Sequence, residues 1–443
     1  MNKTMFLPAH VLDCIRALEQ AGFEAYAVGG CVRDSLLGLT PHDYDLCTNA
    51  LPEETARVFS QYALVRSGEK HGTIGVVMDH QVLEITTFRT EGGYADSRHP
   101  DWVRFVGNLQ EDLARRDFTV NAMAYHPETG YFDPFGGQDD LQRGILRTVG
   151  DPVQRFSEDA LRILRGVRFA VRFGLTPHAD TMEAMKALAP AMDKLARERV
   201  FDELCKLLPL VKAKDLLDYA PILAQAVPAL APCVGFEQHS PYHRYDVYSH
   251  TAHVVESSPM DLAVRWAALL HDCGKPHCFT LGEDGVGHFY GHAQISAQLA
   301  KDTLTQLKAP KALREHVCFL VGYHMNPLEP DKRLLRRRFS QFGPQAVEDL
   351  LALQEADASG LGSGKVIFSE VRAILEEILA EDACLSIKDL QISGSDLLSA
   401  GFAPGPKMGT CLQWLLQQVI DDILPNEKKA LLVAAKEFLR SLP

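Results

Sequence analysis

Strand-forming patterns are confined to the first third of this chain, and this uneven distribution constrains the fold more than any other feature. The segment EAYAVGG (24–30) has the pattern of a short apolar strand, and GTIGVVMD (72–79) and QVLEITTFR (81–89) are two more, separated only by a polar turn. Two strand patterns joined in this way predict a β-hairpin. From about Asp151 onward the apolar spacing is almost entirely helical. The sequence therefore predicts an α+β domain over residues 1–150, with a small mixed sheet, followed by an all-helical remainder.

Three further segments refine this division. HVLDCIRALEQAG (10–22) has helical spacing and ends in glycine, whereas TEGGYADSRHPDWVRF (90–105) is crowded with glycine, aspartate and arginine and predicts a mobile loop. The segment 219–243 is proline-rich, and we expect it to link two helical units.

Length and composition restrict the class of protein. A chain of 443 residues is too long for one ordinary core, so several domains are expected. No apolar run reaches membrane-spanning length, and the N-terminus lacks the pattern of a signal peptide. The ten cysteines include no CxxC pair, which favours reduced thiols and a cytoplasmic location. The net charge of −13 argues against a broad nucleic-acid-coating surface but permits a local basic groove.

A double glycine follows the first strand pattern. Gly29 and Gly30 are succeeded by CVRDSLLG, which has the periodicity of a helix beginning at that point. A strand, a glycine turn and a helix N-terminus present free backbone N–H groups to an anion, and Arg33 adds a guanidinium suited to phosphate oxygens. A glycine turn of this kind is often only structural, so this motif alone leaves both interpretations open.

Three carboxylates suggest a cation site. Asp43 and Asp45 are two residues apart, so in an extended strand both side chains would lie on one face. Oxygen ligands suit Mg²⁺. Glu84 interrupts an otherwise apolar and β-branched strand and would complete a two-metal site from a neighbouring strand. The alternatives are a solvated polar turn for the aspartates and a surface-facing strand residue for Glu84.

A series of motifs in the first part of the chain resembles those of a known family. GGCVRDSLLG, HDYDL, RRDFTVNAMAY, DPFGGQDDL and RFSEDALRILRGVRF occur in this order over about residues 26–174. They resemble the class II CCA-adding tRNA nucleotidyltransferases of the DNA polymerase β superfamily. The resemblance implies that Gly30 and Arg33 hold a nucleoside triphosphate, that Asp43 and Asp45 bind Mg²⁺, and that Arg116 contacts the nucleotide.

The last of these motifs suggests how bases are selected. We expect RFSEDALRILRGVRFAVRF to form one helix capped by Ser157, with a basic stripe along one face. The alternative is that this stripe is only a solvated surface. Its arginines are Arg162, Arg165, Arg168 and Arg172. Cytosine and adenine both present an amino donor beside a ring-nitrogen acceptor, and uracil and guanine reverse this pattern. The carboxylate of Asp159 can only accept hydrogen bonds, and the guanidinium of Arg162 can only donate them. Asp159 would therefore accept from the amino group of C or A and Arg162 would donate to the ring nitrogen, whereas U and G would be rejected. The resemblance assigns this role to the EDxxR motif, which spans Glu158 to Arg162 here.

A second group of residues lies in the helical region and resembles the HD phosphohydrolases. In that family a spaced histidine, an adjacent His-Asp pair and a late aspartate bind a divalent metal, with further histidines that assist or bind a second ion. Imidazole ligands favour a transition metal over Mg²⁺. The alternative is a set of helical histidines with structural roles. The corresponding residues are His250, His271, Asp272 and Asp357, with His292 and His324 as the assisting pair.

The combined interpretation is a cytoplasmic enzyme that adds CCA to the 3′ end of tRNA from CTP and ATP with release of pyrophosphate. It places a nucleotidyltransferase head at 1–150, a helical neck with the nucleotide-selecting helix at 151–232, an HD domain at 233–360, and an RNA-contacting helical region at 361–443. Gly29, Arg165 and Arg168 are added to the expected nucleotide site. Three alternatives stay open: a bacterial poly(A) polymerase, an enzyme that adds only CC or only A, and an HD hydrolase with a degenerate head. No membrane partner is expected, and the oligomeric state is left open.

Overall fold

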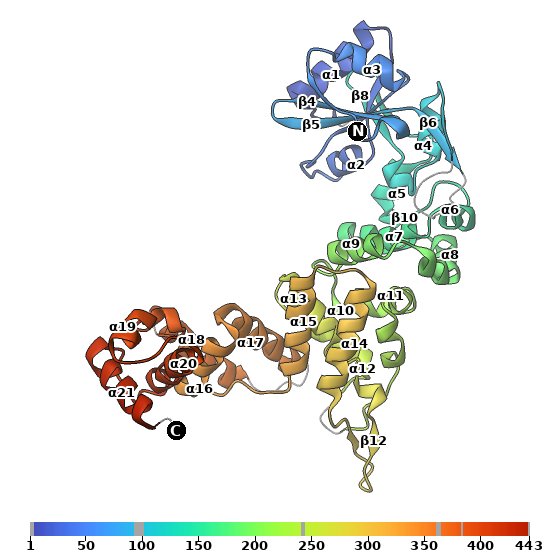
Figure 1. The fold of residues 1–443 in the computed structure, drawn as a ribbon. Coiled ribbons are helices and arrows are strands. Elements are labelled where there is room, and N and C mark those ends of the chain that lie inside the picture. Colours follow the sequence, from blue (N-terminus) through green and yellow to red (C-terminus); the bar gives the residue numbers. More distant parts are fainter. Residues whose placement is uncertain (1–3, 93–101, 241–243, 360–364, 382–383, 442–443) are drawn as a thin grey trace. The chain divides into compact units, whose positions relative to one another are not determined.

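The computed structural model describes residues 4–92, 102–240, 244–359, 365–381 and 384–441 (Figure 1). The chain divides into two compact units. The first comprises Met1–Val211 and Asp218–Ala231, and the second comprises Lys212–Leu217 and Pro232–Pro443. The finer division into four domains stays a prediction.

A seven-stranded mixed sheet forms the centre of the first unit. Its order is β3-β4-β5-β2-β1-β8-β9, and among these described strands β2 and β5 are the parallel pair. The strands are β1 (Ala25–Val28), β2 (Asp45–Thr48), β3 (Ala63–Val65), β4 (Thr73–Met78), β5 (Gln81–Thr87), β8 (Ala124–His126) and β9 (Gly130–Phe132). The α+β class predicted for this region is confirmed.

The predicted hairpin is formed by β4 and β5. Its two turn residues, Asp79 and His80, have φ values of 47° and 63°, the left-handed conformation that a two-residue type I′ turn requires. On its other side β5 pairs with β2 in parallel, with Asp45 opposite Glu84. The hairpin therefore places Glu84 next to Asp45, the first residue of β2.

Short helices surround this sheet. They are α1 (Ala9–Gln20), α2 (Gly30–Leu36), α3 (Pro52–Val58), α4 (Leu109–Ala114) and α5 (Gly137–Arg143). The helix predicted before the first strand is confirmed as α1, whose buried residues Cys14, Ile15 and Leu18 join the same apolar core as Ala27 and Leu46 of the sheet. The helix predicted after the double glycine is confirmed as α2.

The prediction of a loop over 90–105 was wrong at both ends of that segment. Residues Arg89–Gly92 form β6 and residues Trp102–Phe105 form β7, and the two strands pair in an antiparallel ladder. β-branched and aromatic residues favour strands, and they flank the glycine-rich stretch that dominated the prediction. Residues 93–101, for which mobility was also predicted, lie outside the described residues.

The helix predicted to start at Ser157 is also corrected. The segment forms two helices, α6 (Pro152–Glu158) and α7 (Leu161–Phe173), and Asp159 between them is extended, with φ −146° and ψ 103°. Ser157 lies inside α6, where its hydroxyl donates to the carbonyl of Val153 at 2.7 Å. The cap of α6 is Asp151, whose carboxylate accepts from the backbone N–H of Val153.

The rest of the first unit is helical, as expected, apart from one short ladder in which β10 (Ile145–Leu146) pairs with β11 (Thr176–Pro177). Its longer helices are α8 (Ala179–Leu188) and α9 (Arg197–Leu207), followed by α11 (Ala220–Ala226). Helix α9 packs against α7.

Helices dominate the second unit. They are α10 (Ala213–Asp218), α12 (Val247–Ser257), α13 (Leu262–Leu270), α14 (His292–Gln306), α15 (Lys311–Tyr323), α16 (Lys332–Phe342), α17 (Pro344–Ser359), α18 (Lys365–Ala380), α19 (Gly394–Ser399), α20 (Pro406–Ile420) and α21 (Lys428–Ser441). Helix α13 is apolar around most of its circumference, so it is enclosed by α12, α14, α15 and α17. A small hairpin of β12 (Thr280–Leu281) and β13 (Gly287–His288) departs from the helix-only prediction. None of the helices in the described part of the chain is long and apolar enough to span a membrane.

Candidate functional site

The double glycine forms a sharp turn between β1 and α2. Gly29 has φ 75° and ψ −123°, a conformation that residues with a side chain avoid. A Cβ atom at Gly29 would also lie 2.8 Å from Nη1 of Arg116. The backbone conformation therefore favours glycine at this position, and the absence of a Cβ atom also lets the guanidinium of Arg116 approach the backbone.

The three predicted carboxylates lie near this turn. Asp45 is the first residue of β2, and its parallel register with Glu84 places both side chains on one face of the sheet. Asp43 was expected in the same strand; it lies in the preceding loop instead, with its side chain 83% exposed. Burial raises the pKa of Asp45, and Glu84 and Asp43 add to this effect, whereas Arg116 opposes it. The three carboxylates thus repel one another, which is the condition that a bound cation relieves.

A cavity of about 610 Å³ opens beside these groups. Its size falls within the range of small-molecule sites. Ten of the eleven residues predicted for the nucleotide and its metal line this cavity, and Glu84 does not: the ten are Gly29, Gly30, Arg33, Asp43, Asp45, Arg116, Asp159, Arg162, Arg165 and Arg168. The structure therefore brings together the glycine turn, two carboxylates and the arginines of α7, which the sequence separates by more than one hundred residues.

The arginines of α7 are held in place by carboxylates, so the alternative of a solvated basic face was wrong for three of them. Arg162 donates to Glu158 at 2.7 Å, and Arg165 and Arg168 donate to buried partners: Asp117 at 2.7 Å and Glu203 at 2.7 Å, respectively. Burial raises the pKa of Asp117, but Arg165 and the neighbouring hydrogen bonds outweigh it, so the net pKa is about 2. These pairs fix the guanidinium groups before any ligand arrives.

Arg33 is also enclosed. Its side chain donates to Asp34 at 2.7 and 2.9 Å and to the side-chain oxygen of Asn121. Its guanidinium carbon lies 4.2 Å from the ring centre of Phe173, within the range of a cation–π contact. Its contact with a triphosphate stays a prediction. Three of the five N–H donors of its guanidinium already form hydrogen bonds within the protein.

Asp159 and Arg162, the two base-selecting residues, were predicted to lie on one helix; this was wrong, but both line the same cavity. Asp159 lies between α6 and α7, where Oδ1 accepts from the N–H of Leu161 at 3.0 Å and Oδ2 accepts from Nη2 of Arg199 at 2.8 Å. Arg199, on α9, was missed by the sequence reasoning. No local signal connects it to a carboxylate forty positions earlier, although its place on a helix that packs against α7 explains the contact.

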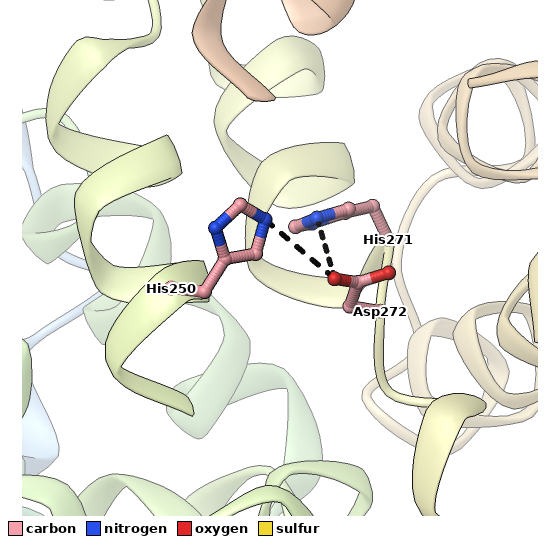
Figure 2. Close-up of side chains that lie close together, drawn as sticks. All are labelled: His250, His271 and Asp272. Carbon is pink, nitrogen blue, oxygen red and sulfur yellow. Dashed lines mark ion pairs between the residues drawn. The ribbon is translucent and has the colours of Figure 1, made fainter. Parts of the chain in front are cut away.

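The second group of predicted residues gathers among the helices of the second unit. His250 is on α12, and His271 and Asp272 follow directly after α13. Figure 2 shows both imidazoles directed at the Asp272 carboxylate, whose Oδ2 lies 3.6 Å from Nε2 of His250 and 3.2 Å from Nε2 of His271. Asp357 Oδ1 lies 2.8 Å from Nε2 of His250. We refer to these four residues, with His292 and His324, as the histidine cluster.

Three of these histidines are oriented by the same local device. Each one places Nδ1 within hydrogen-bond distance of the carbonyl three residues earlier: 2.8 Å for His271, 2.9 Å for His292 and 2.6 Å for His324. If Nδ1 carries the proton in that bond, Nε2 presents a lone pair. This arrangement is the usual support of a metal-binding histidine.

The Nε2 atoms of these three histidines converge on Asp272, at 3.2 Å for His271, 3.4 Å for His292 and 3.9 Å for His324 from its carboxylate oxygens. Nε2 of His292 and Nε2 of His324 are 3.3 Å apart, and Nε2 of His271 makes no hydrogen bond within the described residues. Burial lowers the pKa of His292 and lowers that of His324 to about 4, so both are neutral at pH 7. Two potential ligand sets share Asp272: one adds His250 and His271, and the other adds His292 and His324. Neutral imidazoles with a carboxylate fit a transition-metal ion.

Lys275 is a residue of this site to which the sequence reasoning assigned no role. Its buried Nζ lies 2.8 Å from Oδ2 of Asp272 and donates to Gln238 Oε1 at 2.8 Å. Burial raises the pKa of Asp272, but His271 and Lys275 outweigh it and hold the net pKa well below its usual range. The carboxylate is therefore ionised and available as a ligand.

The strand arrangement and the carboxylate-and-arginine cavity define a nucleotidyltransferase of the polymerase-head type, and residues 25–147 match the family described as "Poly A polymerase head domain". The chain belongs to the CCA-adding enzymes. It is 35% identical to the CCA-adding enzyme of Limosilactobacillus fermentum over 445 aligned positions, covering 98% of each chain, and 35% identical to that of Levilactobacillus brevis, covering 96% of each.

Two further comparisons agree with this assignment. Residues 286–435 match a family described as tRNA nucleotidyltransferase domain 2, a range that crosses the predicted boundary at 360. The solved structure of the Bacillus stearothermophilus CCA-adding enzyme in complex with CTP is similar, with a TM-score of 0.70, 28% identity and coverage of 97% of both chains. The resemblance of the histidine cluster to HD phosphohydrolases stays a prediction.

Proposed function

We propose that this protein completes the 3′ end of tRNA by adding C, C and A from CTP and ATP, with release of pyrophosphate. The observation that carries the proposal is the cavity that Asp43 and Asp45 line together with Asp159 and Arg162. The 3′ oxygen of the RNA attacks the α-phosphorus of the nucleotide, and the bond to the β-phosphate oxygen breaks. The similarity to bacterial CCA-adding enzymes supports the full CCA activity and a cytoplasmic site of action.

The carboxylates around the start of β2 fit Mg²⁺. Asp43 and Asp45 offer carboxylate oxygens, the ligand type that this ion prefers, and Glu84 is adjacent in register. Magnesium bound there would activate the attacking hydroxyl and neutralise charge on the phosphates. Arg116, which acts electrostatically on Asp45, adds positive charge on the same side of the cavity.

Base choice is proposed to depend on Asp159 and Arg162. The carboxylate of Asp159 has about four acceptor positions, and the structure uses two of them, so it can still accept from an exocyclic amino group. Arg162 has five N–H donors; among the described residues three hydrogen bonds engage both donors of Nη1 and one of Nη2, which leaves the donor on Nε and one on Nη2. The pair can therefore match the edge that C and A share.

A single assay tests the proposed function and its alternatives. A tRNA transcript that lacks CCA is incubated with CTP, with ATP, or with both. The proposal expects two C residues with CTP alone and a complete CCA end with both nucleotides. Three results would each contradict the proposal and select one alternative. Addition that stops at CC in the presence of ATP indicates a CC-adding enzyme, and a poly(A) tail indicates a poly(A) polymerase. No addition to this transcript, with addition of A to a transcript that already ends in CC, indicates an A-adding enzyme.

A second activity is proposed for the histidine cluster, supported by its convergent Nε2 atoms. We infer a metal-dependent phosphohydrolase that acts on phosphorylated or damaged RNA 3′ ends. The cluster residues would hold a transition-metal ion, which supplies an activated water when bound. Lys275 and the low pKa of Asp272 keep this site ionised at neutral pH.

A further inference from the structure

The β12–β13 hairpin leads through an exposed aromatic residue, Tyr290, into His292 of the histidine cluster. Figure 1 shows this hairpin projecting from the helices of its unit. Tyr290 follows β13 and is 78% exposed, whereas Tyr62 and Tyr245, which are also exposed, reach only 37%. Exposing so much of an aromatic ring forfeits the stabilisation that burial would give.

Tyr290 does not stand alone. Its ring lies 5.4 Å from the ring of His288, centre to centre, and the two planes differ by only 12°. The residue between them points elsewhere: Phe289 packs against Phe279 at 5.6 Å and lies under Nζ of Lys275 at 5.4 Å. Alternation along the extended chain explains this pattern, since residues two apart share a face. Phe289 anchors the strand inward, and His288 and Tyr290 form a stacked pair outside.

This stacked pair is close to the cluster along the chain. Gly291, with φ 77°, turns the backbone directly from Tyr290 into His292, the first residue of α14. The Cα atoms of Tyr290 and His292 can therefore be at most about 7 Å apart. The side chain of His292 is 9% exposed and that of Asp357 is 24% exposed, so the cluster reaches the surface at these two residues.

We propose that His288 and Tyr290 form a stacking platform for the terminal base of an RNA 3′ end whose phosphate enters the histidine cluster. The inference rests on the phosphohydrolase activity proposed above and names its substrate class: nucleotide 3′-phosphates, not small phosphate esters without a base. An aromatic face stacks on any base, so the platform suits 3′ ends of any sequence. In the reaction, water attacks the phosphorus, the bond to the 3′ oxygen breaks, and inorganic phosphate and a 3′-hydroxyl end are formed.

Steady-state hydrolysis with the Ni²⁺-loaded full-length protein tests the platform. The substrates are a tRNA transcript with a 3′-phosphate and the same transcript with an abasic terminal nucleotide. Loss of one base–aromatic stack in Tyr290→Ala should raise KM for the base-bearing RNA by about 10- to 100-fold and leave the abasic RNA unchanged. Tyr290→Phe should restore the native KM, because the ring stacks and the hydroxyl does not. Leu281→Ala, at an exposed apolar residue of the same hairpin, is the matched control and should change neither substrate.

Equal KM changes for both RNAs in Tyr290→Ala, or none for either, would overturn the platform. If the native protein hydrolyses neither RNA, the phosphohydrolase proposal fails, and a fluorescence titration decides the platform separately. Tyr290→Trp places a reporter in the stack, and adenosine 3′-monophosphate should quench the additional emission, whereas ribose 5-phosphate should not. An absence of nucleotide quenching would reject the platform.

Discussion

The transferase cavity and the histidine cluster are both suited to divalent ions, yet they are built in opposite ways. In the head, Asp45 begins the central strand β2, and the side chain of Asp43 in the preceding loop is 83% exposed. In the cluster, the side chains of His271 and Asp272 are 0% and 2% exposed. Mg²⁺ retains several waters and shares its coordination with substrate phosphates, so exposed oxygen ligands suffice. A resident transition-metal ion needs oriented nitrogen ligands in advance.

The two sites also differ in how their buried polar groups are satisfied. In the head, Arg165 and Arg168 have carboxylate partners within the chain. In the cluster, Nε2 of His271 has no hydrogen-bond partner among the described residues. In the head, these two arginines are therefore paired before a ligand binds, although Nε of Arg116 also lacks a hydrogen-bond partner among the described residues. In the cluster, the unpaired atom is a nitrogen suited to a bound cation. The following predictions test this contrast, beginning with the largest effect.

Asp45→Ala should lower incorporation of CMP and AMP by at least about 10³-fold, because several kcal/mol of charge stabilisation in the transition state are lost. Single-turnover incorporation into a tRNA transcript lacking CCA measures this change. Asp272→Ala is the control and should leave incorporation intact. Incorporation by Asp45→Ala at a rate near that of the native protein would remove Asp45 from the proposed metal site.

Asp272→Ala should abolish hydrolysis of 3′-phosphorylated RNA and binding of Ni²⁺ to the cluster, because both potential ligand sets contain this carboxylate. In the native protein, Ni²⁺ at about 100 times its Kd should stabilise the second unit by about 2.7 kcal/mol, and this gain should be absent from the variant. Thermal unfolding and metal analysis after dialysis measure the two effects. Equal Ni²⁺ content in both proteins would show that the cluster is not the metal site.

Asp159→Ala should relax discrimination against UTP and GTP by about one to two orders of magnitude, since a charge-assisted hydrogen bond is worth about 1.5–3 kcal/mol. Arg162→Ala should act similarly. Arg172→Ala, at the last turn of the same helix, is the matched control and should mainly weaken ligand binding. Single-turnover rates with all four nucleotides decide the outcome, and a uniform loss of rate with an unchanged preference for C and A would contradict base reading by Asp159.

Acid should weaken the polar network of the head through Asp117. A carboxylate whose pKa is lowered on folding, here from 3.8 to about 2, contributes stability that is present above about pH 4 and is lost as the pH falls toward 2. We expect a loss of about 2 kcal/mol over this range, which Asp117→Asn should remove. Arg165→Gln should flatten the same part of the profile, because Arg165 is the charged partner. Urea midpoints between pH 6 and pH 2.5 provide the measurement, and an unchanged acid profile in Asp117→Asn would count against this assignment.

The parts of the fold that depend on neighbouring residues could be predicted. The β4–β5 hairpin follows from alternation and a two-residue polar turn, and α1 follows from its apolar spacing. The residue types of both sites were also accessible, because carboxylates, arginines and histidines limit the chemistry that a site can perform. Their assembly into named roles came from the resemblance to known families, since spacing alone left structural alternatives open.

The parts that depend on distant partners could not be predicted. Helical periodicity continues through Asp159, but its carboxylate caps Leu161 and binds Arg199 from α9, and the chain is extended there. The arginine spacing of α7 is typical of a solvated basic stripe. In the structure, however, Arg165 pairs with Asp117 and Arg168 pairs with Glu203, and both carboxylates belong to other segments. In both cases the energy of a pair formed on folding overrides a weak local preference.

The sequence by itself therefore determined the two architectures, the order of the motifs and the chemical character of each site. Only the tertiary structure decided which groups are exposed and which are paired. It also brought Nε2 of His292 within 3.3 Å of Nε2 of His324, from a different helix end. The physical reason is that hydrogen bonding and burial depend on atoms brought together from distant positions, whereas turn geometry and periodicity are properties of a few consecutive residues.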